Sequence, residues 1–308
     1  MREIILLVGL LVAYCFSASA QCCSAGNPVD SDVNSGLLGK KTLVVGVSYK
    51  QSYSDTYYEG SSKSDYVYFK NSGFQFSSLN LSYGITPRLT VKAEMGYFFA
   101  KSQTFYYADY SRKSYGLADA ELGLKYTAYR SKKGDFMVAG AFNLKIPVGE
   151  FDRKFDNVRL PIDIQPSSGS FRYHLGVLFY KSFSNNKWAL YSYYAAEFAQ
   201  RIQSERISDY KYGNFYISSY AVNYKISKKL STSLQIRGEL REKAVDKGLI
   251  SESTGGYVFF VAPELSYSIL KDWTASTNVN VPFYKNMNGT QLTNKFAFGV
   301  SIKKNIHF

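Results

Sequence analysis

The chain has 308 residues and a formal net charge of +13, and its hydrophobic content of 45% and mean hydropathy of −0.21 are no more apolar than those of a soluble protein. No segment approaches the roughly 18 consecutive apolar residues of a membrane-spanning helix, which excludes a helical membrane protein. Tyr and Phe are nevertheless abundant, at 28 and 22 residues. Membrane-spanning strands account for both facts, because they are apolar only on alternate residues and carry aromatic girdles at both interfaces.

The N-terminus has the pattern of a secretory signal. Arg2 precedes an apolar run from Ile4 to Phe16, and Ala18-Ser19-Ala20 forms a cleavage site. We therefore expect residues 1–20 to be a cleaved signal peptide and the turn-rich residues 21–40 to be a periplasmic tail or plug. Nucleic acid is a poor partner for the positive charge of an exported chain. Lipopolysaccharide phosphates, or anionic solutes inside a barrel, fit that charge better, and the charge does not decide between them.

Cys22 and Cys23 follow the predicted cleavage site. Gln21 stands where a lipidation site needs a small residue, which disfavours a lipoprotein. No His or further Cys lies nearby, so the pair predicts no metal site. We expect no cofactor.

From residue 41 onward the chain alternates apolar and polar residues in long runs. The runs predict strands at about 41–54, 66–85, 89–101, 113–129, 135–149, 169–184, 187–202, 211–226, 230–243, 254–269, 273–284 and 292–308. Pro263 cannot donate a ladder hydrogen bond, so we expect a bulge there.

These twelve runs are joined by short turns that alternate with longer links. An even strand number, short periplasmic turns and long outer loops characterise bacterial outer-membrane barrels, in which the sheet closes so that no backbone group is left unpaired in lipid. The fold class predicted for residues 41–308 is therefore all-β, a closed antiparallel transmembrane β-barrel of about 12 strands. The last strand ends the chain on Phe308, a terminal aromatic typical of the signal that the barrel-assembly machinery reads.

The residues that alternate with the apolar set include many charges, which are predicted to face the lumen. They could form a mixed-charge network that fills a small barrel, or line a solute path in which the basic residues of 230–243 select anions. The predicted lumen-lining residues are Lys92, Glu94, Asp119, Glu121, Lys125, Lys145, Arg172, His174, Arg237, Glu239, Arg241 and Glu264.

The longest link, 149–169, mixes charges with an apolar alternation at 160–164. It is either a solvated surface loop or a loop that folds into the mouth of the barrel. Catalysis by outer-membrane barrels usually needs a His beside Ser or a carboxylate. Only His174 and His307 exist, and no Ser lies in a nucleophile motif. We therefore predict a protein that is not an enzyme and has no catalytic residues.

Three segments, 116–126, 142–180 and 280–308, resemble the outer-membrane barrel family named for the MetA pathway of phenol degradation. The resemblance rests on the GLADAELGLKY strand, the LKIPVG strand end and the QPSSGS approach to the next strand. Pro166-Ser167-Ser168 departs from the glycine that the family often has after Gln165. The resemblance implies a channel or transporter, but its motifs are structural and identify no ligand.

We therefore predict an outer-membrane channel for small solutes, hydrophobic or anionic. Its expected partners are outer-membrane lipid, lipopolysaccharide and the assembly machinery, and we expect a monomer. The alternative is a non-conducting surface barrel that acts as an adhesin, receptor or structural protein. An outer-membrane enzyme is the third hypothesis.

Overall fold

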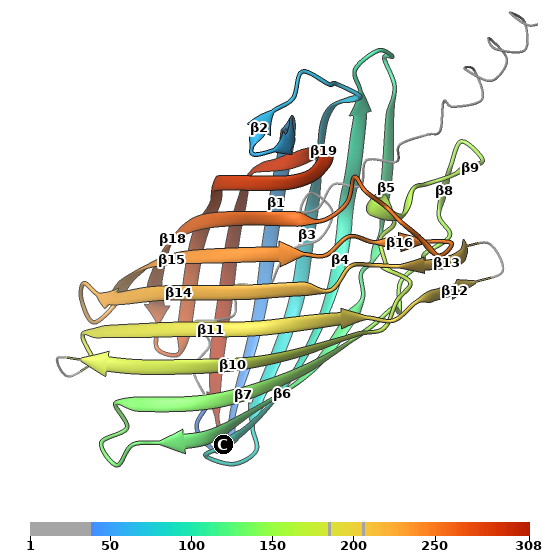
Figure 1. Ribbon diagram of the computed structural model, residues 1–308. Coiled ribbons are helices and arrows are strands. Elements are labelled where there is room, and N and C mark those ends of the chain that lie inside the picture. Colours follow the sequence, from blue (N-terminus) through green and yellow to red (C-terminus); the bar gives the residue numbers. More distant parts are fainter. Residues whose placement is uncertain (1–37, 184–185, 205–206) are drawn as a thin grey trace, which may run out of the picture.

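The computed structural model describes residues 38–183, 186–204 and 207–308, which form a closed antiparallel β-barrel (Figure 1). The predicted signal peptide, the segment 21–37, Cys22 and Cys23 lie outside the described residues. The barrel wall consists of β1 (Thr42–Gly60), β3 (Phe69–Gly84), β4 (Leu89–Phe105), β5 (Ser111–Leu117), β6 (Ala120–Arg130), β7 (Phe136–Ile146), β10 (Arg172–Phe183), β11 (Trp188–Ala199), β14 (Phe215–Lys225), β15 (Leu230–Arg241), β18 (Gly256–Leu270) and β19 (Trp273–His307).

The barrel closes between its first and last strands, because β1 pairs with β19 in a register that begins with Thr42 opposite His307. β19 makes two passes through the wall. Its first part pairs with β18, its last part pairs with β1, and a turn at Gly289 (φ +58°) lies between them. The hydroxyl oxygens of Ser276 and Ser301 lie 3.1 Å apart across the two passes. Of the twelve wall strands, β5 and β6 form one pass, because both pair with β4, and β19 forms two. The wall therefore has the even number of passes that closed antiparallel pairing requires.

The predicted strands match these passes closely, and the fold class is confirmed. The predicted strand 113–129 breaks at residues 118–119 into β5 and β6, both of which pair with β4. The bulge expected at Pro263 is wrong, because the β18–β19 register is continuous from Val261 to Glu264. The irregularity lies at Phe259/Phe260 instead.

Alternation along each strand separates two surfaces. Leu122, Leu124 and Ile236 are exposed on the outside, whereas Glu121, which precedes Leu122, and Arg237, which follows Ile236, are buried inside. This is the arrangement of a barrel with lipid outside and polar groups in the lumen. Among the described residues, no helix is long and apolar enough to cross a membrane.

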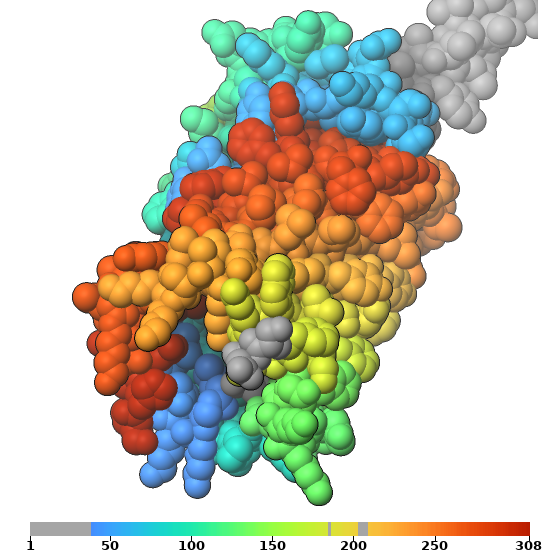
Figure 2. Space-filling view, turned by 90° about the vertical axis from the view of Figure 1, so that its left-hand side faces the viewer, coloured from blue at the N-terminus to red at the C-terminus, as the bar shows by residue number. Residues whose placement is uncertain are grey.

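The two ends of the barrel differ. At one end the strands are joined by short turns, and the surface there is hollowed between the first strands and the turns of the later ones (Figure 2). The other end, called the outer end below, carries the long connections. These contain β2 (Ser62–Lys63), the hairpin of β8 (Lys154–Phe155) and β9 (Val158–Arg159), the 3-10 helix η2 (Ile162–Ile164), and a sheet of β12 (Ile202–Ser204), β13 (Ile207–Lys211), β16 (Val245–Asp246) and β17 (Leu249–Ile250).

Candidate functional site in the barrel interior

A continuous network of charged side chains crosses the inner wall from β4 to β11. Lys92 lies 3.2 Å from Glu94 and 3.4 Å from Glu121. Lys145 then joins Glu121, at 3.9 Å, to Glu197, at 2.8 Å. The positions of Glu94, Glu121 and Lys145 directly oppose one another on β4, β6 and β7. Apart from the Lys92–Glu94 pair on one strand, these contacts join residues that are distant in sequence and that neighbouring strands bring together.

Arg172 ends this network and ties it to the outer connections. Its guanidinium lies 3.2 Å from Glu197 and 2.8 Å from Asp119, in the break between β5 and β6. The same Asp119 carboxylate accepts hydrogen bonds from the Ser167 hydroxyl, at 2.6 Å, and from the Ser168 backbone N–H, at 2.9 Å. One carboxylate thus holds both a wall arginine and the long connection between β7 and β10.

A second charged group lies on β15. The Arg237 Nε donates to Glu239 at 2.8 Å, and the guanidinium lies 4.9 Å from the Phe260 ring centroid. Arg241 stacks on Phe215, at 4.4 Å. All twelve predicted lumen residues are buried or half-buried, including Lys125 and Glu264, which lie outside these two groups.

His174 is 8% exposed, and its Nε2 lies 2.6 Å from the hydroxyl of Tyr193. The rings of His174 and Tyr193 lie nearly parallel, at 15°, so the contact orders both side chains in the interior.

The sequence analysis missed Glu197, which is 4% exposed and links Lys145 to Arg172. It lies on β11, where tyrosine and alanine occupy both faces and the alternation is weak. Register alone could have placed Glu197 inside, because it lies opposite His174.

The long connection after β7 folds inward. Leu160, Ile164, Gln165 and Ser167 are each less than 5% exposed. The Gln165 side-chain amide donates to the carbonyl of Leu160, and the backbone carbonyl of Gln165 accepts from the Lys101 ammonium at 2.9 Å. Residues 160–170 are called the inward loop below. They confirm the expectation of a loop that packs against the barrel, whereas the preceding β8–β9 hairpin is solvated, with Val158 69% exposed.

An apolar patch lies inside the barrel on β3 and β4, near the inward loop. Phe74, Phe76 and Phe98 are at most 5% exposed and pack together with Ala118. The Lys101 ammonium lies 4.8 Å from the Phe98 ring centroid. This patch is closed to water and fills the wall beside the inward loop. The half-buried rings of Tyr180, Tyr191 and Tyr193, which pack against Met137 and Leu178, present aromatic surface to the interior instead.

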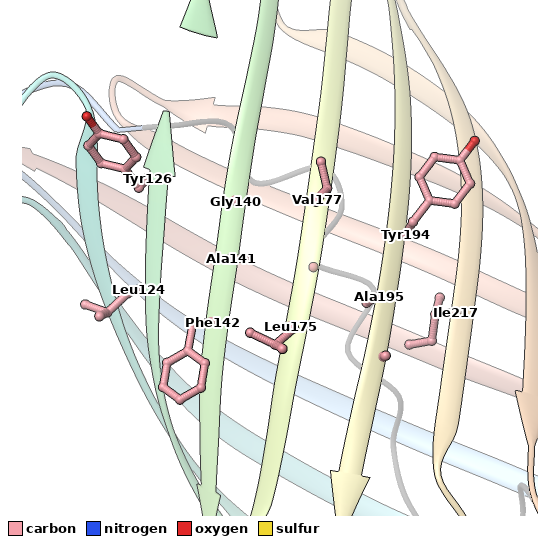
Figure 3. A pocket seen from close by; sticks show the side chains of 12 residues that line it. Leu124, Tyr126, Gly140, Ala141, Phe142, Leu175, Val177, Tyr194, Ala195 and Ile217 are labelled. Carbon is pink, nitrogen blue, oxygen red and sulfur yellow. The ribbon is translucent and has the colours of Figure 1, made fainter. Parts of the chain in front are cut away.

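The outside of the wall also carries a shallow apolar groove of about 630 Å³. Its floor is made of small residues and backbone of β7, β10 and β11. Side chains that include Leu124, Phe142, Leu175 and Tyr194 surround it (Figure 3). These side chains are exposed on the outer surface, so the groove faces the surroundings of the barrel and not the lumen.

Together, the closed wall, the apolar exterior and the charged interior define an outer-membrane-type β-barrel protein. Residues 55–300 match the sequence pattern of the family described as "Putative MetA-pathway of phenol degradation", and the chain belongs to this family. The resemblance noted in the sequence is thereby confirmed. None of the curated proteins gives a significant match.

Among solved structures, the fold is similar to that of the COG4313 outer membrane channel from Pseudomonas putida F1. The TM-score is 0.73 at 14% identity, and the match covers 91% of this chain and 100% of that chain. The KdgM porin matches with a TM-score of 0.46 at 12% identity, over 85% of this chain and 99% of that one. The toluene transporter TodX from P. putida matches with a TM-score of 0.45 at 8% identity, over 91% and 94%. At these identities the likeness concerns the fold.

Proposed function

We propose that the protein is an outer-membrane channel for small solutes. The observation that carries this proposal is the interior charge network of Lys92, Glu121, Lys145, Glu197 and Arg172 inside a wall whose exterior is apolar. Buried charges are expensive to maintain away from water, and an aqueous lumen lowers that cost. In such a channel the diameter, the charged lining and the loops determine passage.

The charge lining supports weak ion selectivity. The predicted lumen residues include six basic side chains and five acidic ones, and Glu197 makes the numbers equal. Ion pairing further reduces the attraction for ions, as with Arg237 beside Glu239. We therefore propose that the basic residues of β15 give at most a slight anion preference.

Small molecules that combine an aromatic ring with a polar group are the solutes that this interior favours. Their rings can contact the half-buried rings of Tyr180, Tyr191 and Tyr193 on the inner face of β10 and β11, while hydroxyl or carboxylate groups meet the charged network. The phenol in the family's description agrees with this class.

Solute flux into proteoliposomes tests this proposal. Vesicles containing the refolded protein are expected to admit phenol-sized aromatic acids faster than a neutral sugar of similar mass. Tyr191→Ala removes a half-buried ring of this group and is expected to reduce that preference several-fold. Entry at the rate of protein-free vesicles would contradict the proposal.

A non-conducting surface barrel is the second candidate function. One observation favours it: the outer end exposes aromatic side chains such as Tyr106 and Tyr107, of which Tyr107 is 82% exposed. Exposed aromatic groups of this kind suit contact with a partner. The same flux assay separates the two candidates, because an adhesin or receptor admits no solute.

A further inference from the structure

The outer turn of β19 is buried on both faces. Gln291, Leu292, Thr293 and Asn294 are consecutive strand residues, and none is more than 5% exposed. In a barrel wall every second residue faces outward, so four consecutive buried residues show that this segment is covered by protein on both sides. Figure 1 shows β19 bending sharply near this end. Residues 285–294 are called the tip hairpin below.

The contacts of the tip hairpin hold it against the outer ends of the neighbouring strands at the mouth of the barrel. The Gln291 side chain donates to the Gly255 carbonyl at 2.8 Å, and Lys285 donates to the Thr293 hydroxyl at 2.8 Å. Leu292 packs in a cluster with Tyr57 and Phe69, against which Phe105 also lies. This cluster lies between the outer ends of β1, β3 and β4.

The inward loop packs against the inner wall near the same end, and Asp163, Gln103 and Arg112 connect it to the cluster that contacts the tip hairpin. The Gln103 amide nitrogen donates to the Asp163 carboxylate at 2.6 Å, and its oxygen accepts from the Arg112 Nε at 2.8 Å. The Arg112 guanidinium lies 5.2 Å from the Phe69 ring centroid and 5.1 Å from that of Phe105. Asp163 belongs to the inward loop, and the two rings pack with the tip hairpin.

The contacts from Asp163 through Gln103 to Arg112, called the relay below, have one defined orientation. Gln103 is fully buried, and each end of its amide faces a group of the opposite hydrogen-bonding kind. Neither Asp163 nor Arg112 can shift without leaving a buried amide group unsatisfied, which is unfavourable. Displacing one closure therefore weakens the contacts of the other.

We propose that the inward loop and the tip hairpin are two halves of one outer gate, coupled through Asp163, Gln103 and Arg112, so that they open together. This inference rests on the proposed channel function. It assigns the relay a role in conformational coupling, whereas the charge network deeper in the barrel lines the path.

Thiol labelling tests the coupling without any need for conduction. In a chain with all three cysteines replaced by Ser, one variant carries Leu292→Cys in the tip hairpin and another carries Ile164→Cys in the inward loop. Both positions are at most 3% exposed, so a water-soluble maleimide reaches them only when the respective closure opens. The rate is followed by mass spectrometry on the refolded barrel.

Arg112→Gln is expected to speed the labelling of both probes at least tenfold. Gln103→Leu removes the hydrogen bonds to both Asp163 and Arg112 while leaving those two residues in place, and it is also expected to speed the labelling of both probes. Lys113→Gln is the matched control, since Lys113 is the exposed neighbour of Arg112 on β5 and its labelling rates should equal those of the parent chain. Circular dichroism confirms that each variant is folded.

Two results would overturn the proposal. Unchanged rates at both probes would show that the relay does not hold the closures. Acceleration at one probe alone would show that the two closures move independently. The failure of the channel function appears separately, as an absence of solute flux.

Discussion

The replacement Glu197→Gln tests whether the interior charge network supports the barrel. Glu197 is 4% exposed and bridges Lys145 and Arg172 at 2.8 and 3.2 Å. Glutamine keeps the shape and one acceptor but leaves two cations facing a neutral group. Removing one partner of a buried ion pair costs about 3–5 kcal/mol, and hydrogen bonds to charged groups contribute about 1.5–3 kcal/mol each.

Arg172 retains Asp119 in this variant, and lumen water partly solvates Lys145. We therefore expect a loss below the range for a fully buried pair, about 2–3 kcal/mol of unfolding free energy. Urea titration of the refolded protein in lipid vesicles, followed by tryptophan fluorescence, measures it. The control is Glu252→Gln, which breaks an exposed ion pair with Lys243 and should cost less than about 1 kcal/mol. Equal unfolding midpoints for Glu197→Gln and the parent chain would refute the reasoning.

Three further predictions concern the outer face, the inward loop and a turn. Leu175→Lys places a charge on the outer face and should destabilise the folded barrel in vesicles by about 2–4 kcal/mol, whereas Leu249→Lys at the outer end should have little effect in the same urea titration. Gly169→Ala should be at least about 1 kcal/mol more destabilising than Gly134→Ala in urea. Both glycines have φ near +70°, but only the Cβ at 169 would meet a ring, that of Phe151, at 2.4 Å. Hydrogen bonds from Lys181 and Ser131 lower the pKa of Asp135 from 3.8 to about 2. Because this folded-state pKa is depressed, the contribution of the turn to stability is present above pH 4 and is lost as the pH falls toward about 2. NMR titration of the Asp135 carboxyl group measures its pKa, and urea titration at several pH values measures the stability. The Asp135→Asn variant should lose this part of the pH dependence of stability.

Much of the fold could be predicted from the sequence because the exterior of a barrel imposes a strict period of two. The strand ending at Phe308 and the strand through Leu122 and Leu124 alternate cleanly, and their faces were assigned correctly. Strand β11 was ambiguous because its tyrosines and alanines fit both lipid and lumen, so Glu197 was missed.

The closures at the outer end could not be predicted in the same way. The partners of Asp163, Gln103 and Arg112 are distant in sequence and depend on how the connections fold over the mouth. The apolar alternation at 160–164 indicated packing but not its location. The burial of the tip hairpin could not be predicted from the sequence, because Gln291, Thr293 and Asn294 are polar residues of types that are usually exposed.

Single-channel conductance tests the central claim most directly. The refolded protein in a planar bilayer, with a salt gradient across it, is predicted to give discrete conductance steps with a reversal potential that shows at most a slight anion preference, because the charges of the network are paired. Arg112→Gln should increase the fraction of time spent open, whereas Lys113→Gln should not. A correctly folded barrel that never conducts, in the parent chain or in the Arg112→Gln variant, would contradict the channel function and favour a surface receptor or adhesin.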